Sequence, residues 1–116
     1  IAEMLQYGTV SVTDMYGHGQ QMAEAFLSSG MKCNLGLGTT AGVDQGFYEQ
    51  SRYQEYQRLF ADYHQAANGR LAVDTSIHAE YTSNPRLVAE MAEYTKEMNA
   101  RCHIHLSETK AEQEAA

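Results

Sequence analysis

The sequence predicts an α/β domain built from parallel βα units. Short β-branched or apolar segments that suit buried strands alternate with longer segments whose apolar residues recur at helical spacing. Such alternation is typical of parallel strands joined by right-handed helical crossovers. The segment CHIHLSET also passes directly from strand signals to helix signals, as a strand does at the carboxyl edge of an α/β sheet. The four strand candidates cover residues 9–15, 32–38, 71–77 and 101–107.

The first strand candidate, TVSVTDM, is followed by a short helix within residues 17–30. We expect this helix to bury Met22, Ala25 and Phe26 and to end at Gly30, which suits the left-handed position after a helix. The second strand candidate, KCNLGLG, contains glycines that indicate close backbone approach. The segment TTAGVDQG that follows it is predicted to be a loop.

The third unit begins after a long polar helix predicted for residues 48–67. In this helix Tyr56, Leu59, Phe60 and Tyr63 recur at helical spacing, and an Asn-Gly pair ends it. We therefore interpret its tyrosines as helix packing rather than as an aromatic binding site. The strand candidate LAVDTSI comes next.

The last helix begins with a clear start signal. Asn84 supplies an N-cap and Pro85 suits the first helical position. We expect the helix to end near Asn99 and to lead into the fourth strand candidate. The residues predicted to be buried on its inner face are Leu87, Val88, Met91, Thr95 and Met98.

Composition excludes several classes of partner. The 116 residues carry 15 acidic and 8 basic side chains, a formal net charge of −7, without a basic run. Nucleic acid and anionic membranes are therefore poor partners, and no apolar run reaches the length of a membrane span. Cys33 and Cys102 lie in apolar-flanked strand candidates, which predicts buried, reduced thiols and a cytoplasmic location.

Both ends of the chain fall inside helix signals. The start, AEMLQYG, has the pattern of the last turns of a helix closed by Gly8. The end, ETKAEQEAA, begins a helix, with Thr109 as its predicted N-cap and Glu112 at the capping-box distance. We therefore expect residues 1–116 to form a single segment of a longer βα-repeat protein.

The segment CHIHLSET gathers groups that metal hydrolases use. In a strand His103 and His105 share one face, while Cys102, Ile104 and their apolar neighbours share the other. Glu108 follows just past the strand. However, two histidines at this spacing are also common as hydrogen-bonded core residues. A catalytic zinc requires about three protein ligands, more than these two histidines supply. The spacing alone leaves both interpretations open.

Three blocks of the sequence together resemble the amidohydrolase superfamily. GTVSVTDMY resembles its second-strand block, IHAEYTSNPRLVAEMAEY its HAPYTCS-type block, and CHIHLSET its IHIHLAET block. The resemblance covers essentially the whole chain. It points to the branch that contains the cytosine, S-adenosylhomocysteine and guanine deaminases and the triazine chlorohydrolases. It implies a partial (β/α)8 TIM barrel, about strands 2 to 5, and hence a fragment of a metal-dependent hydrolase barrel domain.

The resemblance assigns three roles. His105 matches the fifth-strand histidine that ligates a single divalent metal, zinc or alternatively iron. Glu108 matches the glutamate that moves protons between metal-activated water and the substrate. His78 matches the histidine after the fourth strand that contacts the substrate. A metal makes hydroxide available near neutral pH, and a neighbouring carboxylate is suited to relay its proton.

The chain departs from the family in three ways. The paired histidines of the first barrel strand, the sixth-strand histidine and the eighth-strand aspartate have no counterpart here. The family's HAPYT is HAEYT in this chain, which adds the Glu80 carboxylate. Residues 34–38 lack the arginine with which some deaminases of this branch hold an anionic substrate, so a substrate bearing a carboxylate is not expected.

The other polar residues near these blocks are interpreted as structural. His103 lies one residue pair deeper on the strand than His105 and is expected to be a core residue. Asp14 is expected to brace the loop that follows its strand, and His18 and His64 are expected to be exposed.

Two functions of different classes remain. The first is an enzyme fragment that acts on a C–N or C–Cl bond of a small heteroaromatic substrate, and is itself inactive without the rest of the barrel. The second is a non-catalytic α/β half-barrel scaffold, or a decayed homologue with relic histidines. A flavodoxin-like nucleotide binder is disfavoured because no glycine-rich phosphate loop is present. Unpaired edge strands at 9–15 and 101–107 predict a homo-oligomer.

Overall fold

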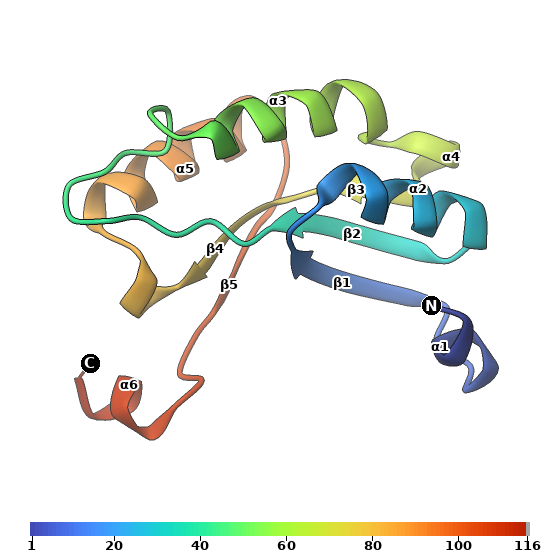
Figure 1. The fold of residues 1–116 in the computed structure, drawn as a ribbon, viewed down its shortest axis with the longest axis horizontal. Helices are drawn as coiled ribbons and strands as arrows, with labels where there is room; N and C mark the ends of the chain where they lie inside the picture. The colour runs from blue at the N-terminus through green and yellow to red at the C-terminus, as the bar shows by residue number, and fades with distance from the viewer. Residues whose placement is uncertain (116) are drawn as a thin grey trace.

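The computed structural model describes residues 1–115, which form five strands, six α-helices and one 3-10 turn. Strands and helices alternate as the sequence predicts (Figure 1). The elements in chain order are α1 (Ala2–Gln6), β1 (Ser11–Tyr16), α2 (Gly19–Ser29), β2 (Lys32–Leu37), α3 (Ser51–Tyr63), α4 (Ala66–Gly69), β3 (Leu71–Val73), β4 (Thr75–Ala79), η1 (Glu80–Thr82), α5 (Pro85–Glu97), β5 (Cys102–His105) and α6 (Lys110–Ala115).

All paired strands are parallel, in two sheets. Strands β1, β2 and β3 form one sheet in that order, and β4 pairs with β5 in the other. Parallel pairing with intervening helices confirms the predicted α/β class. The predicted edge positions of the first and last strands are also confirmed, because each of these strands pairs on one side only within residues 1–115.

The predicted strand 71–77 is divided in two, which corrects the sequence interpretation. The Asp74 amide donates to the Leu35 carbonyl at 2.9 Å, whereas the next amide, that of Thr75, donates to the Arg101 carbonyl at 2.9 Å. Neighbouring amides of a strand point to opposite sides, so the division shows in the ladders: the one to β2 ends at Val73 and the one to β5 begins at Thr75. Beyond this point an isolated bridge joins Ile77 to Thr39. A pattern of apolar residues cannot reveal such a division, because both halves are buried.

A tyrosine hydroxyl bridges the two sheets where the strand divides. The hydroxyl of Tyr56, on α3, accepts from the amides of Leu37 and Ser76, each at 2.9 Å, and donates to the Leu37 carbonyl at 2.9 Å. Tyr56 is fully buried, and burial raises the pKa of its hydroxyl, which keeps it protonated as a donor. The side chain thus supplies hydrogen bonds that a continuous strand ladder would otherwise provide.

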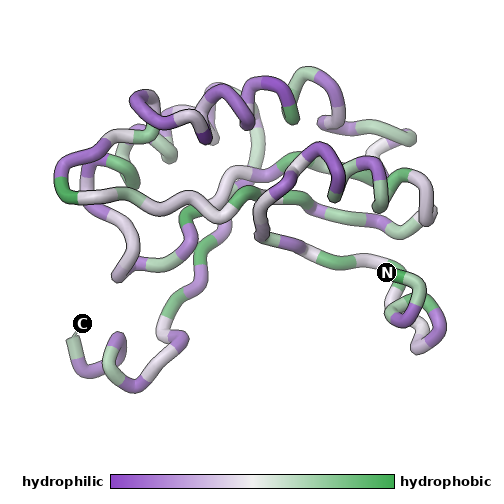
Figure 2. The backbone as a smooth tube through the Cα atoms, viewed as in Figure 1, coloured by the Kyte–Doolittle hydropathy of each residue, from purple (hydrophilic) through white to green (hydrophobic). Residues whose placement is uncertain are grey.

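The core lies between the strands and the helices α2, α3 and α5, which cover one side of the strands (Figure 1). Hydrophobic segments follow the strands, whereas α3 is largely hydrophilic (Figure 2). The close packing of α2 on α3 requires Gly19, because a Cβ there would lie 2.6 Å from Leu59 Cδ1. The opposite side of the strands carries no helix along its length, and α1 and α6 lie at its two ends.

The helices confirm most of the predicted boundaries. Asn84 caps α5 by accepting from the Leu87 amide, and Gly30 ends α2 with a φ of 78°. The predicted burial of Ala25 and Val88 is wrong, since both are exposed. Their neighbours Ala23 and Tyr94 face the core instead, together with Phe26, Leu87 and Met91.

Three further expectations need correction: the end of the helix predicted for residues 48–67, the exposure of His64 and the burial of Cys102. Helix α3 ends at Tyr63, and His64, predicted to be exposed, is half-buried: its Nδ1 accepts from the Val73 amide at 3.1 Å. Of the two thiols, Cys33 is buried as predicted but Cys102 is exposed. The pattern indicates which way a strand residue points, and Cys102 is exposed because no element covers its side of β5. No helix within residues 1–115 is long and apolar enough to cross a membrane.

Candidate functional site

Two predicted site histidines meet where β4 and β5 end. His105 is the last residue of β5 and pairs in register with Ala79 at the end of β4, directly after His78. The two imidazole ring centroids lie 5.4 Å apart and nearly perpendicular, at 87°. Because the strands are parallel, this rim is the carboxyl edge where α/β proteins place ligand-binding residues.

The ring of His78 is oriented by the turn that follows it. Its Nδ1 lies 2.9 Å from the Thr82 hydroxyl, which also donates to the Ala79 carbonyl at 3.2 Å. With Nδ1 engaged, Nε2 is the nitrogen left to meet a substrate. His78 was assigned a role from the sequence, whereas Thr82 was not. The signal that could have indicated Thr82 is the short spacing within HAEYT, whose last three residues form the 3-10 turn η1.

Glu108 reaches the same rim from the loop after β5. The Tyr81 hydroxyl donates to Glu108 Oε2 at 3.4 Å, and the Tyr81 ring packs edge-on against His78 with centroids 6.0 Å apart. Tyr81 therefore connects the two segments, a contact that sequence reasoning also missed. Partial desolvation and the Glu108 charge raise the pKa of Tyr81, so its hydroxyl keeps its proton at neutral pH.

The predicted capping box after β5 is present. The Thr109 amide donates to Glu112 Oε1 at 2.9 Å, and the Glu112 amide donates to the Thr109 hydroxyl at 3.3 Å. This reciprocal pair starts α6 directly behind Glu108.

His103 lies deeper on β5 than His105 and is half-buried. Its register partner is Ser76, and its Nδ1 is buried without a hydrogen-bond partner among the described residues. Burial lowers the pKa of His103, against the opposing charge of Asp74, so the ring is held neutral. Its position agrees with the expected core role, whereas His105 is exposed at the rim.

The described residues do not by themselves fit a metal ion. Across residues 1–115 no group of three or more histidine, cysteine, aspartate or glutamate side chains is placed to hold one. His105 offers one exposed imidazole at the rim, and a catalytic zinc needs about three protein ligands. A complete catalytic metal site would therefore need ligands in addition to those that residues 1–115 bring together.

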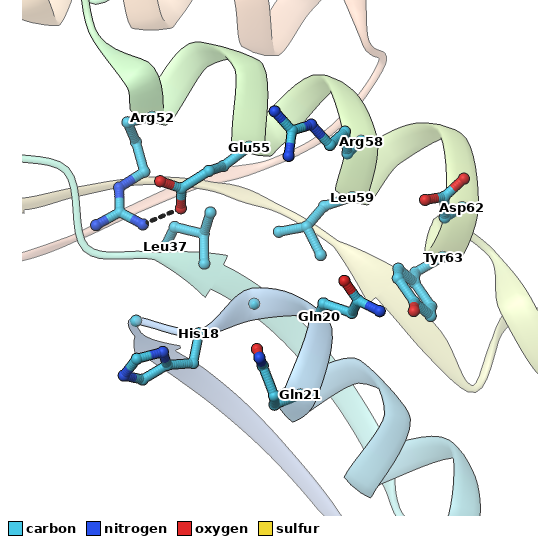
Figure 3. A pocket seen from close by; sticks show the side chains of 12 residues that line it. His18, Gln20, Gln21, Leu37, Arg52, Glu55, Arg58, Leu59, Asp62 and Tyr63 are labelled. Atoms are coloured by element: carbon cyan, nitrogen blue, oxygen red, sulfur yellow. Dashed lines mark hydrogen bonds and ion pairs between the residues drawn. The ribbon is translucent and has the colours of Figure 1, made fainter.

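Two hollows lie near these residues. One of about 500 Å³ lies between η1 and α6, beside the rim, and is lined by Glu80, Tyr81, Thr109, Ala111, Glu112 and Ala115. The other, of about 520 Å³, lies between α2 and α3, and its lining includes Gly17 just after β1 and Leu37 at the end of β2 (Figure 3). In the second hollow Arg52 is already paired with Glu55. Its remaining charges, Arg58 and Asp62, offset one another, and we place no site there.

The sequence matches the amidohydrolase family over residues 1–116. It is 36% identical over 115 residues to a 5'-deoxyadenosine deaminase of Methanosphaera stadtmanae, covering 97% of this chain and 26% of that protein. It is 35% identical over 114 residues to a 5-methylthioadenosine/S-adenosylhomocysteine deaminase of Dictyoglomus turgidum, covering 98% of this chain and 26% of that protein. The chain thus spans about a quarter of the length of these curated relatives.

The fold is similar to that of solved triazine hydrolase structures. One variant superposes with a TM-score of 0.74 at 18% identity, covering 91% of this chain and 27% of that one. A second variant superposes with a TM-score of 0.73 at 21% identity, covering 92% and 28%. These similarities concern the fold.

Proposed function

This chain belongs to the amidohydrolase family, and on that premise we propose that it forms about strands 2 to 5 of a (β/α)8 barrel hydrolase. The reaction we propose is the hydrolytic removal of an amino group from a small heteroaromatic ring. Removal of chlorine from such a ring is the alternative chemistry. The observation that carries the proposal is the convergence of His78, His105 and Glu108 on one rim.

The three residues have distinct proposed roles. Glu108 is the general acid and base, because its carboxylate is exposed at the rim, where it can reach a substrate. His78 holds the substrate through Nε2, since Thr82 occupies its other nitrogen. His105 supplies one ligand to a divalent metal, zinc or iron, whose other ligands come from outside residues 1–116. When bound, that ion would supply activated water near neutral pH.

The relatives' names support deamination of a nitrogen heterocycle. The two deaminases described above are named for adenosine derivatives, which carry an exocyclic amino group on an aromatic ring. Residues 34–38 contain no arginine, and Glu80 adds a carboxylate at η1. We therefore propose a substrate that bears no carboxylate. These names do not favour the alternative of a non-catalytic scaffold.

The proposal is tested by removing the carboxylate of Glu108. In the intact enzyme we expect Glu108→Gln to lower kcat for deamination of an adenosine analogue by about 10²–10⁴-fold, the usual contribution of a general acid or base. Metal content, measured by elemental analysis, should stay unchanged. Glu114→Gln is the matched control, because it removes an exposed charge from the neighbouring helix. Unchanged turnover in Glu108→Gln would remove Glu108 from the mechanism.

Residues 1–116 alone should be inactive and should bind metal weakly. The free edges of β1 and β5 invite pairing with another chain, so we propose that the isolated segment forms a homo-oligomer. Light scattering tests this directly. A monodisperse monomer that unfolds cooperatively would instead indicate an independent small domain.

A further inference from the structure

We propose that Glu112 is a positioning residue for Glu108, holding the loop that presents the Glu108 carboxylate at the rim. The inference rests on the function proposed above and adds a residue to that site. Glu112 itself is 6% exposed, so it acts through the loop rather than on a substrate.

Both oxygens of the Glu112 carboxylate accept hydrogen bonds from the residues just before α6. Oε1 accepts from the amide and the hydroxyl of Thr109, both at 2.9 Å. Oε2 accepts from the Glu108 amide at 3.3 Å. In a capping box the glutamate side chain needs to accept only from the N-cap amide. The bond from the Glu108 amide is additional, and it restrains the backbone of the residue whose side chain points to the rim.

The backbone conformation just before Glu108 explains why this loop needs an additional hydrogen bond. Ser107 adopts a φ of +53°, in the left-handed region that non-glycine residues seldom occupy. This turn redirects the chain from β5 to α6 and brings Glu108 back beside Tyr81, whose hydroxyl contacts its carboxylate. A strained turn persists only where its surroundings hold it. Glu112 restrains this turn by accepting the hydrogen bond from the Glu108 amide.

The burial of Glu112 is consistent with this role. A buried carboxylate is costly unless hydrogen bonds or a cation compensate it. Within residues 1–115 Glu112 takes part in no ion pair, and its side chain accepts only from Glu108 and Thr109. The compensation therefore comes from the loop itself, so the loop and the carboxylate stabilise one another.

The substitution Glu112→Gln separates positioning from capping. The amide oxygen of glutamine can keep both bonds to Thr109, whereas its NH2 group cannot accept from the Glu108 amide. In the intact enzyme we expect kcat to fall roughly tenfold with KM unchanged, because small misplacement of a catalytic group is costly. Amide exchange at Glu108 should accelerate while exchange within α6 stays unchanged. Glu112→Ala, which removes both functions, should lower kcat further and also destabilise α6.

Glu114→Gln is the matched control, since it removes an exposed carboxylate from the same helix, one paired with Lys110 at 3.4 Å. It should leave kcat and exchange at Glu108 unaltered. The unsubstituted enzyme provides a measurement independent of any folding defect. Its Glu108 amide should be protected from exchange although the residue is exposed.

An unprotected Glu108 amide in the unsubstituted enzyme would overturn the inference. So would a Glu112→Gln enzyme with unchanged kcat, or one in which kcat falls without faster exchange at Glu108. Glu108→Gln is measured alongside. An active Glu108→Gln enzyme overturns the proposed function and this inference together. An inactive one beside a fully active Glu112→Gln enzyme overturns the positioning role alone.

Discussion

Strands β2 and β5 have nearly the same pattern and very different surroundings. The segments KCNLGL and RCHIHL both place a cysteine and two large aliphatic residues on one face. In β2 the aliphatic residues, Leu35 and Leu37, are 0% exposed. The corresponding Ile104, in β5, and Leu106, just after its end, are 38% and 65% exposed.

The difference lies in what covers each strand. Strand β2 pairs on both sides, with β1 and β3, and α2 packs on it. Strand β5 pairs only with β4 within residues 1–115, and α6 begins beyond its carboxyl end (Figure 1). Alternation thus decides which residues share a face, while neighbouring elements decide whether that face is buried.

The opposite faces differ in chemistry. Where β5 carries His103 and His105, β2 carries Asn34 and Gly36. A Cβ at Gly36 would lie 2.6 Å from Ser76 Oγ and 3.2 Å from His103 Cε1, so this position of β2 has no room for a functional side chain. In β5 the corresponding His105 is exposed at the rim. Close packing and functional groups therefore occupy different strands.

The largest expected effect concerns the covered strand. Leu35→Ala should lower the free energy of unfolding of residues 1–116 by about 2–5 kcal/mol, because it removes fully buried methyl groups and leaves a cavity. Urea unfolding followed by circular dichroism measures the change. Ile104→Ala in β5 is the matched substitution and should cost about 1 kcal/mol or less. Equal losses in the isolated segment would contradict the difference in cover.

The same pair sharpens the comparison in the intact enzyme. If additional barrel elements cover the free side of β5, Ile104→Ala should there cost about 2–4 kcal/mol, approaching the value for a core position. An unchanged small cost would show that this face stays exposed in the whole protein.

A smaller effect is expected at the bridge between the two sheets. Tyr56→Phe should lower the free energy of unfolding by about 2–3 kcal/mol, because buried amides of β2 and β4 lose their acceptor. Thermal or urea unfolding gives the value. Tyr53→Phe is the control, since its hydroxyl only accepts an exposed bond from Gln57 at 3.1 Å. A Tyr56→Phe variant as stable as the control would contradict the bridging role.

The smallest effect is a difference in thiol reactivity. Burial, with the nearby Asp14 charge, raises the pKa of Cys33 to about 12, so its reactive thiolate is scarce at pH 8. Cys102 is exposed. Ellman's reagent should therefore modify one thiol in the native protein and two in guanidinium. Rapid modification of both thiols under native conditions would contradict the burial of β2.

Local signals explain why much of the fold could be predicted. Three such signals each depend on residues close together in the sequence, and the structure contains all of them. They are the N-cap at Asn84, the left-handed Gly30 and the Thr109–Glu112 capping box. The division of a strand at Asp74 was not predictable, because it depends on which distant strand each amide meets. The exposure of Cys102 was missed for the same reason.

The candidate site divides in a similar way. Strand alternation predicts that His103 and His105 lie on the same face of β5. The roles proposed for His78, His105 and Glu108 rest on the family resemblance. Their meeting at one rim requires parallel pairing of two strands far apart in sequence. The contact between Tyr81 and Glu108 joins residues 27 positions apart, and neither motif indicates it.

We propose that His105, at the rim of β5, is a ligand of the catalytic metal. Metal content of the intact enzyme, measured by elemental analysis for His105→Asn and His103→Asn, tests it most directly. These histidines share one strand face two residues apart, but only His105 lies beside His78 at the rim. We predict that His105→Asn loses the metal and that His103→Asn retains it. Full metal content in His105→Asn, or equal loss in both variants, would contradict the account.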